Sequence, residues 1–247
     1  MTTLRSPTPP GVPPLRVFRS GSQRLRRGKG TKLARLGKSA VFVACLLPLA
    51  NLGLDALHSK LTANPIAEVM NRLGFWTLSF LVLTLAATPL KALFGWTFQM
   101  RVRRMVGLFA FFYAALHFTT YLALDQAFDL SDIGADIVKR KFITVGFAAF
   151  VLLIPLAVTS TDGAVKRLGF RRWKRIHRLV YVAAVLGVIH FVWRVKADLL
   201  QPALFGAALV FLFAVRLATS LKKRAAAVKS SSLTGEGAPP PGGGIPA

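Results

Sequence analysis

The sequence contains few acidic residues and a single cysteine. Asp and Glu together number nine in 247 residues, and only 17% of all residues are charged, whereas a soluble domain carries about a quarter. The lone Cys45 excludes a disulfide framework and a Cys-based metal site, including an iron–sulfur cluster, which needs several thiolate ligands. No Gly-rich phosphate loop follows a predicted strand, so we expect no nucleotide-binding dehydrogenase module in this chain.

Long apolar runs are abundant instead. The chain is 53% hydrophobic and its mean hydropathy is +0.52. The runs are about twenty residues long, the length that a helix needs to cross a bilayer. They predict an all-α polytopic membrane helical bundle with six transmembrane helices within residues 39–222. The flanking segments are predicted to be disordered. Residues 1–38 form a basic tail, and residues 223–247 form a Ser/Gly/Pro-rich tail. The predicted spans are 39–57, 75–95, 105–124, 142–160, 175–196 and 202–221.

The net charge of +24 invites a nucleic-acid interpretation. Its distribution indicates membrane topology and anionic lipid instead. With the N-terminus in the cytoplasm, most Lys and Arg residues fall on the cytoplasmic side and most acids on the other. The positive-inside rule therefore predicts that both termini are cytoplasmic. The lipid bilayer is the expected partner of these cations, and no nucleic acid is expected.

Two histidines occupy matching depths in different predicted spans. His117 lies thirteen residues after Arg104, and His190 lies fifteen after Arg175, so each is about 20 Å from the cytoplasmic end of its helix. Ionisable residues inside a span are functional candidates, although a hydrogen bond between helices is the alternative for either one alone. Two facing imidazoles could supply both axial ligands of a haem iron. Such a centre passes electrons and does not bind oxygen.

The surroundings of this pair suit a flat macrocycle. Gly187, three residues before His190, would leave room for a ring on its helix face. Six aromatic residues could pack around a macrocycle, and ordinary core or lipid packing explains any one of them equally well. They are Phe111, Phe112, Tyr113, Phe118, Phe191 and Trp193.

His177 lies thirteen residues before His190, about 20 Å nearer the cytoplasm. A second haem would need a partner at Arg104 or Arg103, so the haem count is one or two, and His177 is a second ligand or an inner-site contact. Cations beside it could hold a haem propionate or a flavin phosphate. A positive-inside cluster is the favoured alternative for them. These residues are Arg171, Arg172, Arg175 and Arg178.

Several stretches carry a family resemblance. They are "RVRRMVGLFAFFYAALHFTTYLALD", "LAVTSTDGAVKRLGFRRWKRIHRLVYVAAVLGVIHFVW" and the following "QPALFGAALVFL". Over about residues 39–222 the chain resembles the MsrQ (YedZ) family, which belongs to the ferric-reductase-like transmembrane group. The long basic N-terminal tail departs from the pattern of that family.

The resemblance implies a function. The family passes electrons through haem b across the bacterial inner membrane, as a multi-pass protein. The recipient is MsrP, a periplasmic molybdopterin enzyme that reduces methionine sulfoxide in proteins. Electrons come from the quinone pool or from cytoplasmic flavin reductases, and FMN is an associated cofactor. The core histidines of the family match His117, His177 and His190. The chain would then be an electron-transfer subunit, not an enzyme with its own substrate site.

Two other functions are alternatives to this one. A self-contained ferric or oxygen reductase-type cytochrome b is weakened by the missing nucleotide-binding domain. A transporter or scaffold with a proton relay is weakened because all nine acids lie in loops, tails or span ends. The loop 125–141, with Asp125, Asp129, Asp132 and Asp136, is a candidate docking surface for a periplasmic partner by its side and length alone.

Overall fold

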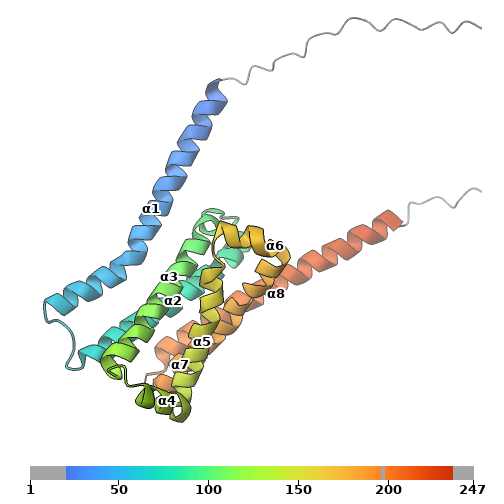
Figure 1. Cartoon of the computed structure of the whole chain (residues 1–247). Helices are drawn as coiled ribbons and strands as arrows, with labels where there is room; N and C mark the ends of the chain where they lie inside the picture. Colours follow the sequence, from blue (N-terminus) through green and yellow to red (C-terminus); the bar gives the residue numbers. More distant parts are fainter. Residues whose placement is uncertain (1–20, 196–197, 236–247) are drawn as a thin grey trace, which may run out of the picture. The chain divides into compact units, whose positions relative to one another are not determined.

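The computed structural model describes residues 21–195 and 198–235, which form helices and no strand. The side chains within 21–34 and 229–235, and those of residues 130 and 132, are outside this description. The predicted disorder of the two tails stays a prediction for 1–20 and 236–247, which lie outside the described residues, whereas the structure makes 21–38 part of α1 and 223–235 part of α8. The helices are α1 Gly21–Leu57, α2 Pro65–Phe94, α3 Phe98–Thr120, the π-helix η1 Tyr121–Asp125, α4 Leu130–Lys139, α5 Lys141–Val158, α6 Asp162–Ile176, α7 Leu179–Arg194 and α8 Leu200–Gly235 (Figure 1).

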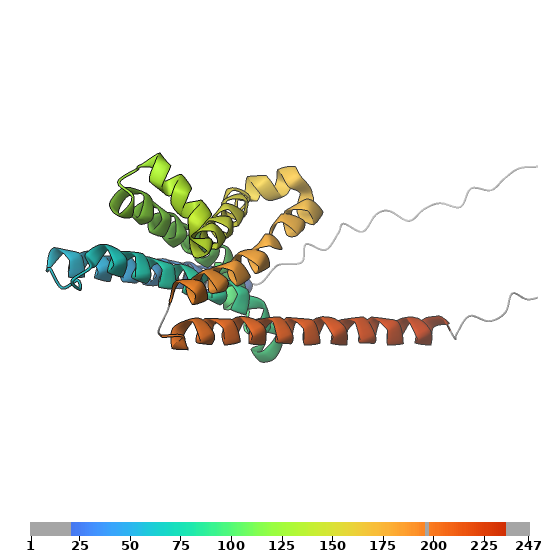
Figure 2. The ribbon, with the colours of Figure 1, turned by 90° about the horizontal axis from the view of Figure 1, so that it is seen from below.

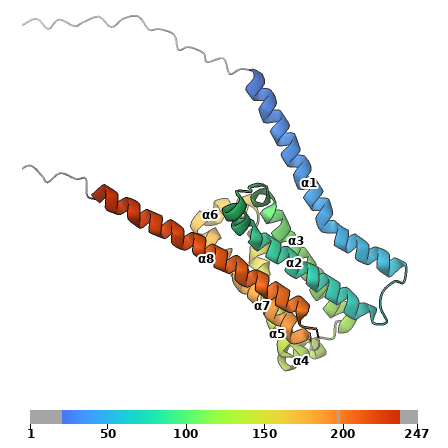
Figure 3. The ribbon, with the colours of Figure 1, turned by 180° about the vertical axis from the view of Figure 1, so that it is seen from behind.

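The all-α membrane architecture is confirmed. Within the described residues, five helices are long and apolar enough to cross a membrane, and α6 with α7 forms a sixth candidate that is bent by 41°. The helices α2, α3, α5 and α7 pack against one another, and α8 runs along α2 and α7 (Figures 2 and 3). The short helices α4 and α6 lie at opposite ends of α5 (Figure 1). We call these the α4 end and the α6 end of the bundle.

Several predicted boundaries differ from the structure, and two of the differences have a clear local cause. The second span begins at Pro65 instead of residue 75, because Asn64 caps α2 by accepting a hydrogen bond from the Ala67 amide at 3.1 Å, with proline in the first turn. The fifth predicted span, 175–196, crosses the break between α6 and α7, so α7 itself has 16 residues. α2 therefore extends beyond its apolar run, whereas the fifth predicted span begins at residue 175, before α7 starts at Leu179.

At two prolines inside the spans, Pro48 and Pro89, side chains from neighbouring helices bind backbone groups at the interrupted helix. In α1, next to Pro48, the hydroxyl of Tyr113 accepts a hydrogen bond from the Leu49 amide at 3.1 Å and donates one to the Cys45 carbonyl at 2.9 Å. That hydroxyl occupies the position of the helical bond between Cys45 and Leu49. This explains why Tyr113 is completely buried.

Pro89 in α2 has a comparable effect on Leu85. Because proline has no amide hydrogen, the carbonyl of Leu85 lacks its usual helical donor. The guanidinium of Arg216, in α8, donates to this carbonyl and also to the Tyr181 hydroxyl at 2.5 Å. An arginine inside a span thus has a structural role, in fastening α8 to α2 and α7.

Candidate functional site

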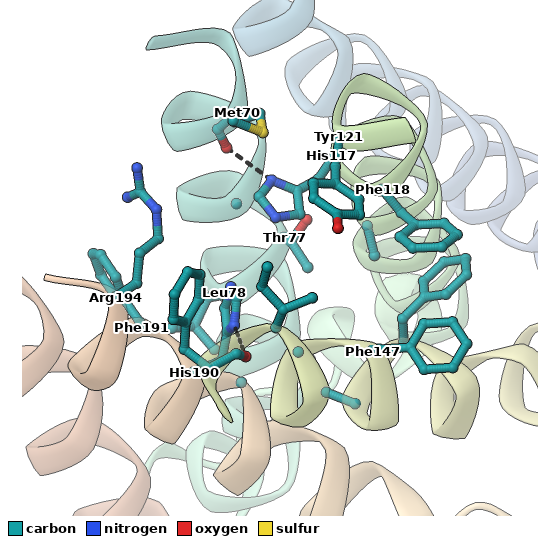
Figure 4. Close-up of a pocket in the computed structure, with 18 of the residues that line it drawn as sticks. Met70, Thr77, Leu78, His117, Phe118, Tyr121, Phe147, His190, Phe191 and Arg194 are labelled. Carbon is teal, nitrogen blue, oxygen red and sulfur yellow. Dashed lines mark hydrogen bonds between the residues drawn. The ribbon is translucent and has the colours of Figure 1, made fainter. Parts of the chain in front are cut away.

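His117 of α3 and His190 of α7 face each other across the bundle. Their ring centroids are 6.2 Å apart and their planes are nearly perpendicular, at 82° (Figure 4). The sequence predicted that the two histidines lie at the same depth, and the structure places their rings next to each other. Both side chains are partly buried and line the same cavity.

A backbone carbonyl orients each ring. Nδ1 of His117 lies 2.8 Å from the Met70 carbonyl oxygen of α2, and Nδ1 of His190 lies 2.7 Å from the Phe142 carbonyl oxygen of α5. A carbonyl can only accept, so each Nδ1 carries the hydrogen and each Nε2 keeps its lone pair. Hydrogen bonds of this kind fix the tautomer of a metal-binding histidine and raise its basicity.

A glycine makes each of these contacts feasible. Gly74 lies four residues after Met70, and Gly146 lies four residues after Phe142. A β-carbon at Gly146 would lie only 2.5 Å from Nδ1 of His190, and one at Gly74 would lie 3.3 Å from Cε1 of His117. Residues i and i+4 share a helix face, so each glycine clears the surface over which the imidazole reaches the carbonyl.

The cavity between the histidines has a volume of about 310 Å³, within the range of small-molecule and cofactor sites. Its wall toward the α6 end is apolar and includes Leu81, Leu153 and Ala183. Its polar lining lies toward the α4 end. At that end it includes Asn71, Tyr121, Asp125, Arg140 and Arg194, and Thr77 lines the cavity further along α2.

The histidine pair is placed to hold one iron. An imidazole nitrogen binds a metal at about 2 Å, so two rings that bind the same metal would have centroids at most about 6 Å apart once the ring size is added. The observed 6.2 Å agrees with this separation. Haem, when bound there, would supply a one-electron carrier with no open coordination position for substrate. His117 and His190 would hold the iron, and the cavity walls would hold the macrocycle.

The six aromatic residues named from the sequence take different positions. Phe118 and Phe191 line the cavity, together with Phe147, Phe142 and Phe75, which the sequence argument missed. Phe111 stacks on Phe150 at 5.9 Å. Phe112 and Trp193 are more than a third exposed on the outside of the bundle, where lipid would contact them. The hydroxyl of Tyr113 forms hydrogen bonds with the backbone of α1. Gly187 lines the cavity, as predicted from its position.

His177 lies in the break between α6 and α7 and does not line this cavity. Its ring stacks on Trp173 with centroids 4.0 Å apart, and its Nδ1 lies 3.2 Å from the carbonyl oxygen of the same residue. Trp173 in turn donates to the Thr159 carbonyl at 3.0 Å, which ties α6 to the end of α5. The Nε2 of His177 has no hydrogen bond within the described residues.

The predicted inner-site cations are exposed on α6 and at the start of α7, and none of them lines the cavity. They are Arg171, Arg172, Arg175 and Arg178. Arg104, one of the two positions that a second haem would need, forms an ion pair with Asp162 instead. This guanidinium holds the pKa of the Asp162 carboxyl below its usual value of 3.8 through a hydrogen bond and its charge.

Comparison with known proteins supports one family. A family described as "Ferric reductase like transmembrane component" matches residues 73–188. A protein of Rhodospirillum rubrum is 58% identical over 77% of this chain and 91% of its own length, and one of Herminiimonas arsenicoxydans is 52% identical over 80% and 90%. Both are named "Protein-methionine-sulfoxide reductase heme-binding subunit MsrQ".

The chain belongs to the MsrQ family. This confirms the resemblance that the histidine-containing stretches carry. A third MsrQ relative, from Azospira oryzae, is 45% identical over 75% of this chain and 80% of its own length. The family match at 73–188 covers α2 from Leu73 onward, all of α3 and α5, and α7 as far as Val188, so it covers most of the four helices that surround the cavity.

Four site features escaped the sequence argument: the Met70 and Phe142 carbonyls, and Gly74 and Gly146. The sequence signal for them was a glycine near the same end of its helix as the histidines. Gly146 lies inside the predicted span 142–160, and Gly74 lies just before the predicted span 75–95 but inside α2. Arg194 was also missed as a site residue, although it lies one helical turn from His190.

Proposed function

We propose that this chain is a haem b-binding electron-transfer subunit of a protein-methionine-sulfoxide reductase system. The observation that carries the proposal is the histidine pair, with each Nδ1 hydrogen-bonded to a backbone carbonyl and each Nε2 directed by that bond. The names of the MsrQ relatives, heme-binding subunits of this system, support the same cofactor.

The residues of the chain bind and orient, and none of them performs substrate chemistry. Met70 and Phe142 hold the imidazoles in one tautomer, and Gly74 and Gly146 allow the close approach. The apolar wall of Leu81, Leu153 and Ala183 excludes water from one side of the cavity.

The direction of electron flow follows from the proposed orientation. With both termini in the cytoplasm of a bacterial inner membrane, the α4 end and its cavity face the periplasm. The recipient is then an MsrP-like molybdopterin reductase that repairs oxidised periplasmic proteins. The donor is the quinone pool or a cytoplasmic flavin reductase. FMN, or a propionate of a second haem, is held near His177 by Arg171, Arg172, Arg175 and Arg178.

The ligand assignment is tested on the purified full-length chain. We expect a b-type Soret and α-band spectrum, and loss of most haem in His117→Ala and in His190→Ala. His58→Ala is the matched control, because His58 is exposed and lies outside the cavity. Full haem retention in both cavity variants, measured as haem per chain, would overturn the assignment.

The place in the system is tested by reconstitution. The chain in lipid vesicles, with a reduced quinone and an MsrP-type reductase outside, should reduce methionine sulfoxide in a protein substrate, whereas His190→Ala should not. Reduction of ferric iron or oxygen at the same rate without the reductase would favour the self-contained reductase instead.

A further inference from the structure

The cavity between the histidines has one polar edge and one apolar edge. Arg194 and Phe191 lie on one side of the histidine pair, and Phe118 and Phe147 lie on the opposite side (Figure 4). On the apolar edge, Phe118 packs on Phe147 at 5.7 Å and on Phe150 at 4.9 Å. A flat ligand between the two imidazoles therefore meets two chemically different edges.

Arg194 is the residue that distinguishes the polar edge. It ends α7 four residues after His190, so the two side chains share a helix face and lie about 6 Å apart along the axis. The side chain is half-buried and lines the cavity.

Arg194 has no carboxylate partner among the described residues, unlike the other arginines at the α4 end. Arg72 pairs with Asp55 at 2.5 Å and with Glu68 at 2.6 Å, and Arg140 pairs with Asp136 at 3.2 Å. Removing a cation from water is costly unless an anion pairs with it.

We propose that Arg194 is the carboxylate-binding residue of the cavity and that its ligand is a propionate of the haem. This inference rests on the proposed haem binding and adds the orientation of the macrocycle. The propionate edge lies beside Arg194, and the apolar edge lies on the other side of the histidine pair, against Phe118 and Phe147. An arginine fork can bind a carboxylate through two parallel hydrogen bonds, which gives it directional as well as electrostatic selectivity.

The test compares haem with its dimethyl ester, in which both propionates are uncharged. Apo full-length protein, in detergent, is titrated with each compound, and affinity is read from the Soret band. Wild-type protein should bind haem roughly tenfold to a hundredfold more tightly than the ester, the effect of a charge-assisted hydrogen bond. Arg194→Gln should lose most of this preference by weakening haem binding while leaving ester binding nearly unchanged.

Two further variants make the result specific. Lys139→Gln removes a positive charge from the same end of the bundle at an exposed residue outside the cavity, and it should keep the full preference. Arg194→Lys should keep a reduced preference, since it retains the charge without the fork. If Arg194→Gln does not fold, Arg194→Lys tests the same role, because its preference for haem over the ester should be smaller than that of wild-type protein.

The outcomes separate this inference from the proposed function. An equal preference for haem in wild-type protein and in Arg194→Gln, or an equal loss in Lys139→Gln, would overturn the role of Arg194 and leave haem binding intact. A wild-type protein that binds neither compound would overturn both.

Discussion

The carbonyl oxygen of Phe142 accepts a hydrogen bond from Nδ1 of His190 at 2.7 Å, across the contact between α5 and α7. Met70 of α2 and His117 of α3 form the same arrangement at 2.8 Å. In both pairs a glycine follows the carbonyl by one helical turn. The backbone of a neighbouring helix therefore sets the orientation of each imidazole, and a single methyl group at either glycine is the smallest change that tests this.

The first prediction is a graded response to alanine at these glycines. A β-carbon at position 146 would lie 2.5 Å from Nδ1 of His190, whereas one at position 74 would lie 3.3 Å from His117. Gly146→Ala should therefore displace His190 and remove most haem, and Gly74→Ala should retain most of it. Haem per chain is measured by absorption after purification. Gly53→Ala, where no atom lies within 4 Å, should match wild-type protein, and a larger loss in Gly74→Ala than in Gly146→Ala would contradict the argument.

The histidine pair was predictable because it depends on sequence spacing alone. Two helices of known direction, each with a histidine about 20 Å from the same membrane surface, bring the rings to one level. The carbonyl partners were not predictable, because a backbone oxygen looks the same at every residue. Which turn of α2 lies against α3, and which turn of α5 lies against α7, depends on packing across the bundle.

The helix boundaries show a second limit of hydropathy. Residues 65–74 contain Glu68, Asn71 and Arg72, so their mean hydropathy marks a loop, but a cap and ion pairs make them helical. The break before α7 has the opposite cause. The basic stretch of α6 continues directly into an apolar run, and the turn at His177 and Arg178 leaves no signal in composition.

The second prediction concerns the pair formed by Pro89 and Arg216. Removing the guanidinium in Arg216→Met leaves the Leu85 carbonyl without a donor, and an unpaired buried acceptor costs about 1–3 kcal/mol. In Pro89→Ala the new amide can donate to Leu85, so Arg216→Met should cost less in that background. Unfolding of the four proteins in detergent gives the coupling energy, which should be about 1 kcal/mol. Strictly additive effects would show that Pro89 does not create the acceptor.

The third prediction is a pH dependence at the α6 end. Arg104 lowers the pKa of Asp162 below 3.8 in the folded chain, so the pair stabilises the fold above that pH. As the pH falls through the lowered pKa, the folded carboxylate takes up a proton and the contribution disappears. The melting temperature of wild-type protein should therefore exceed that of Asp162→Asn by a small amount near neutral pH, because the Asp162 side chain is 85% exposed. The difference should vanish once the pH has fallen below the lowered pKa of Asp162.

The control for this effect is the Arg104→Gln background, in which Asp162→Asn should have almost no effect at any pH. A difference that persists there would mean that Asp162 acts through the start of α6, at whose first turn it lies.

The last prediction separates one haem from two. His177 stacks on Trp173 and lies outside the cavity that His117 and His190 share, so His177→Ala should leave the haem of that pair in place. Electron delivery from the donor should nevertheless fall, because the proposed inner site is changed. Haem per chain and the rate of reduction by a quinol or reduced flavin are measured on the same preparation. An unchanged haem content with slower reduction supports a single haem and a separate inner contact. Loss of half of the haem would identify His177 as a ligand of a second one, and loss of all of it would show that the depth argument joined the wrong histidines.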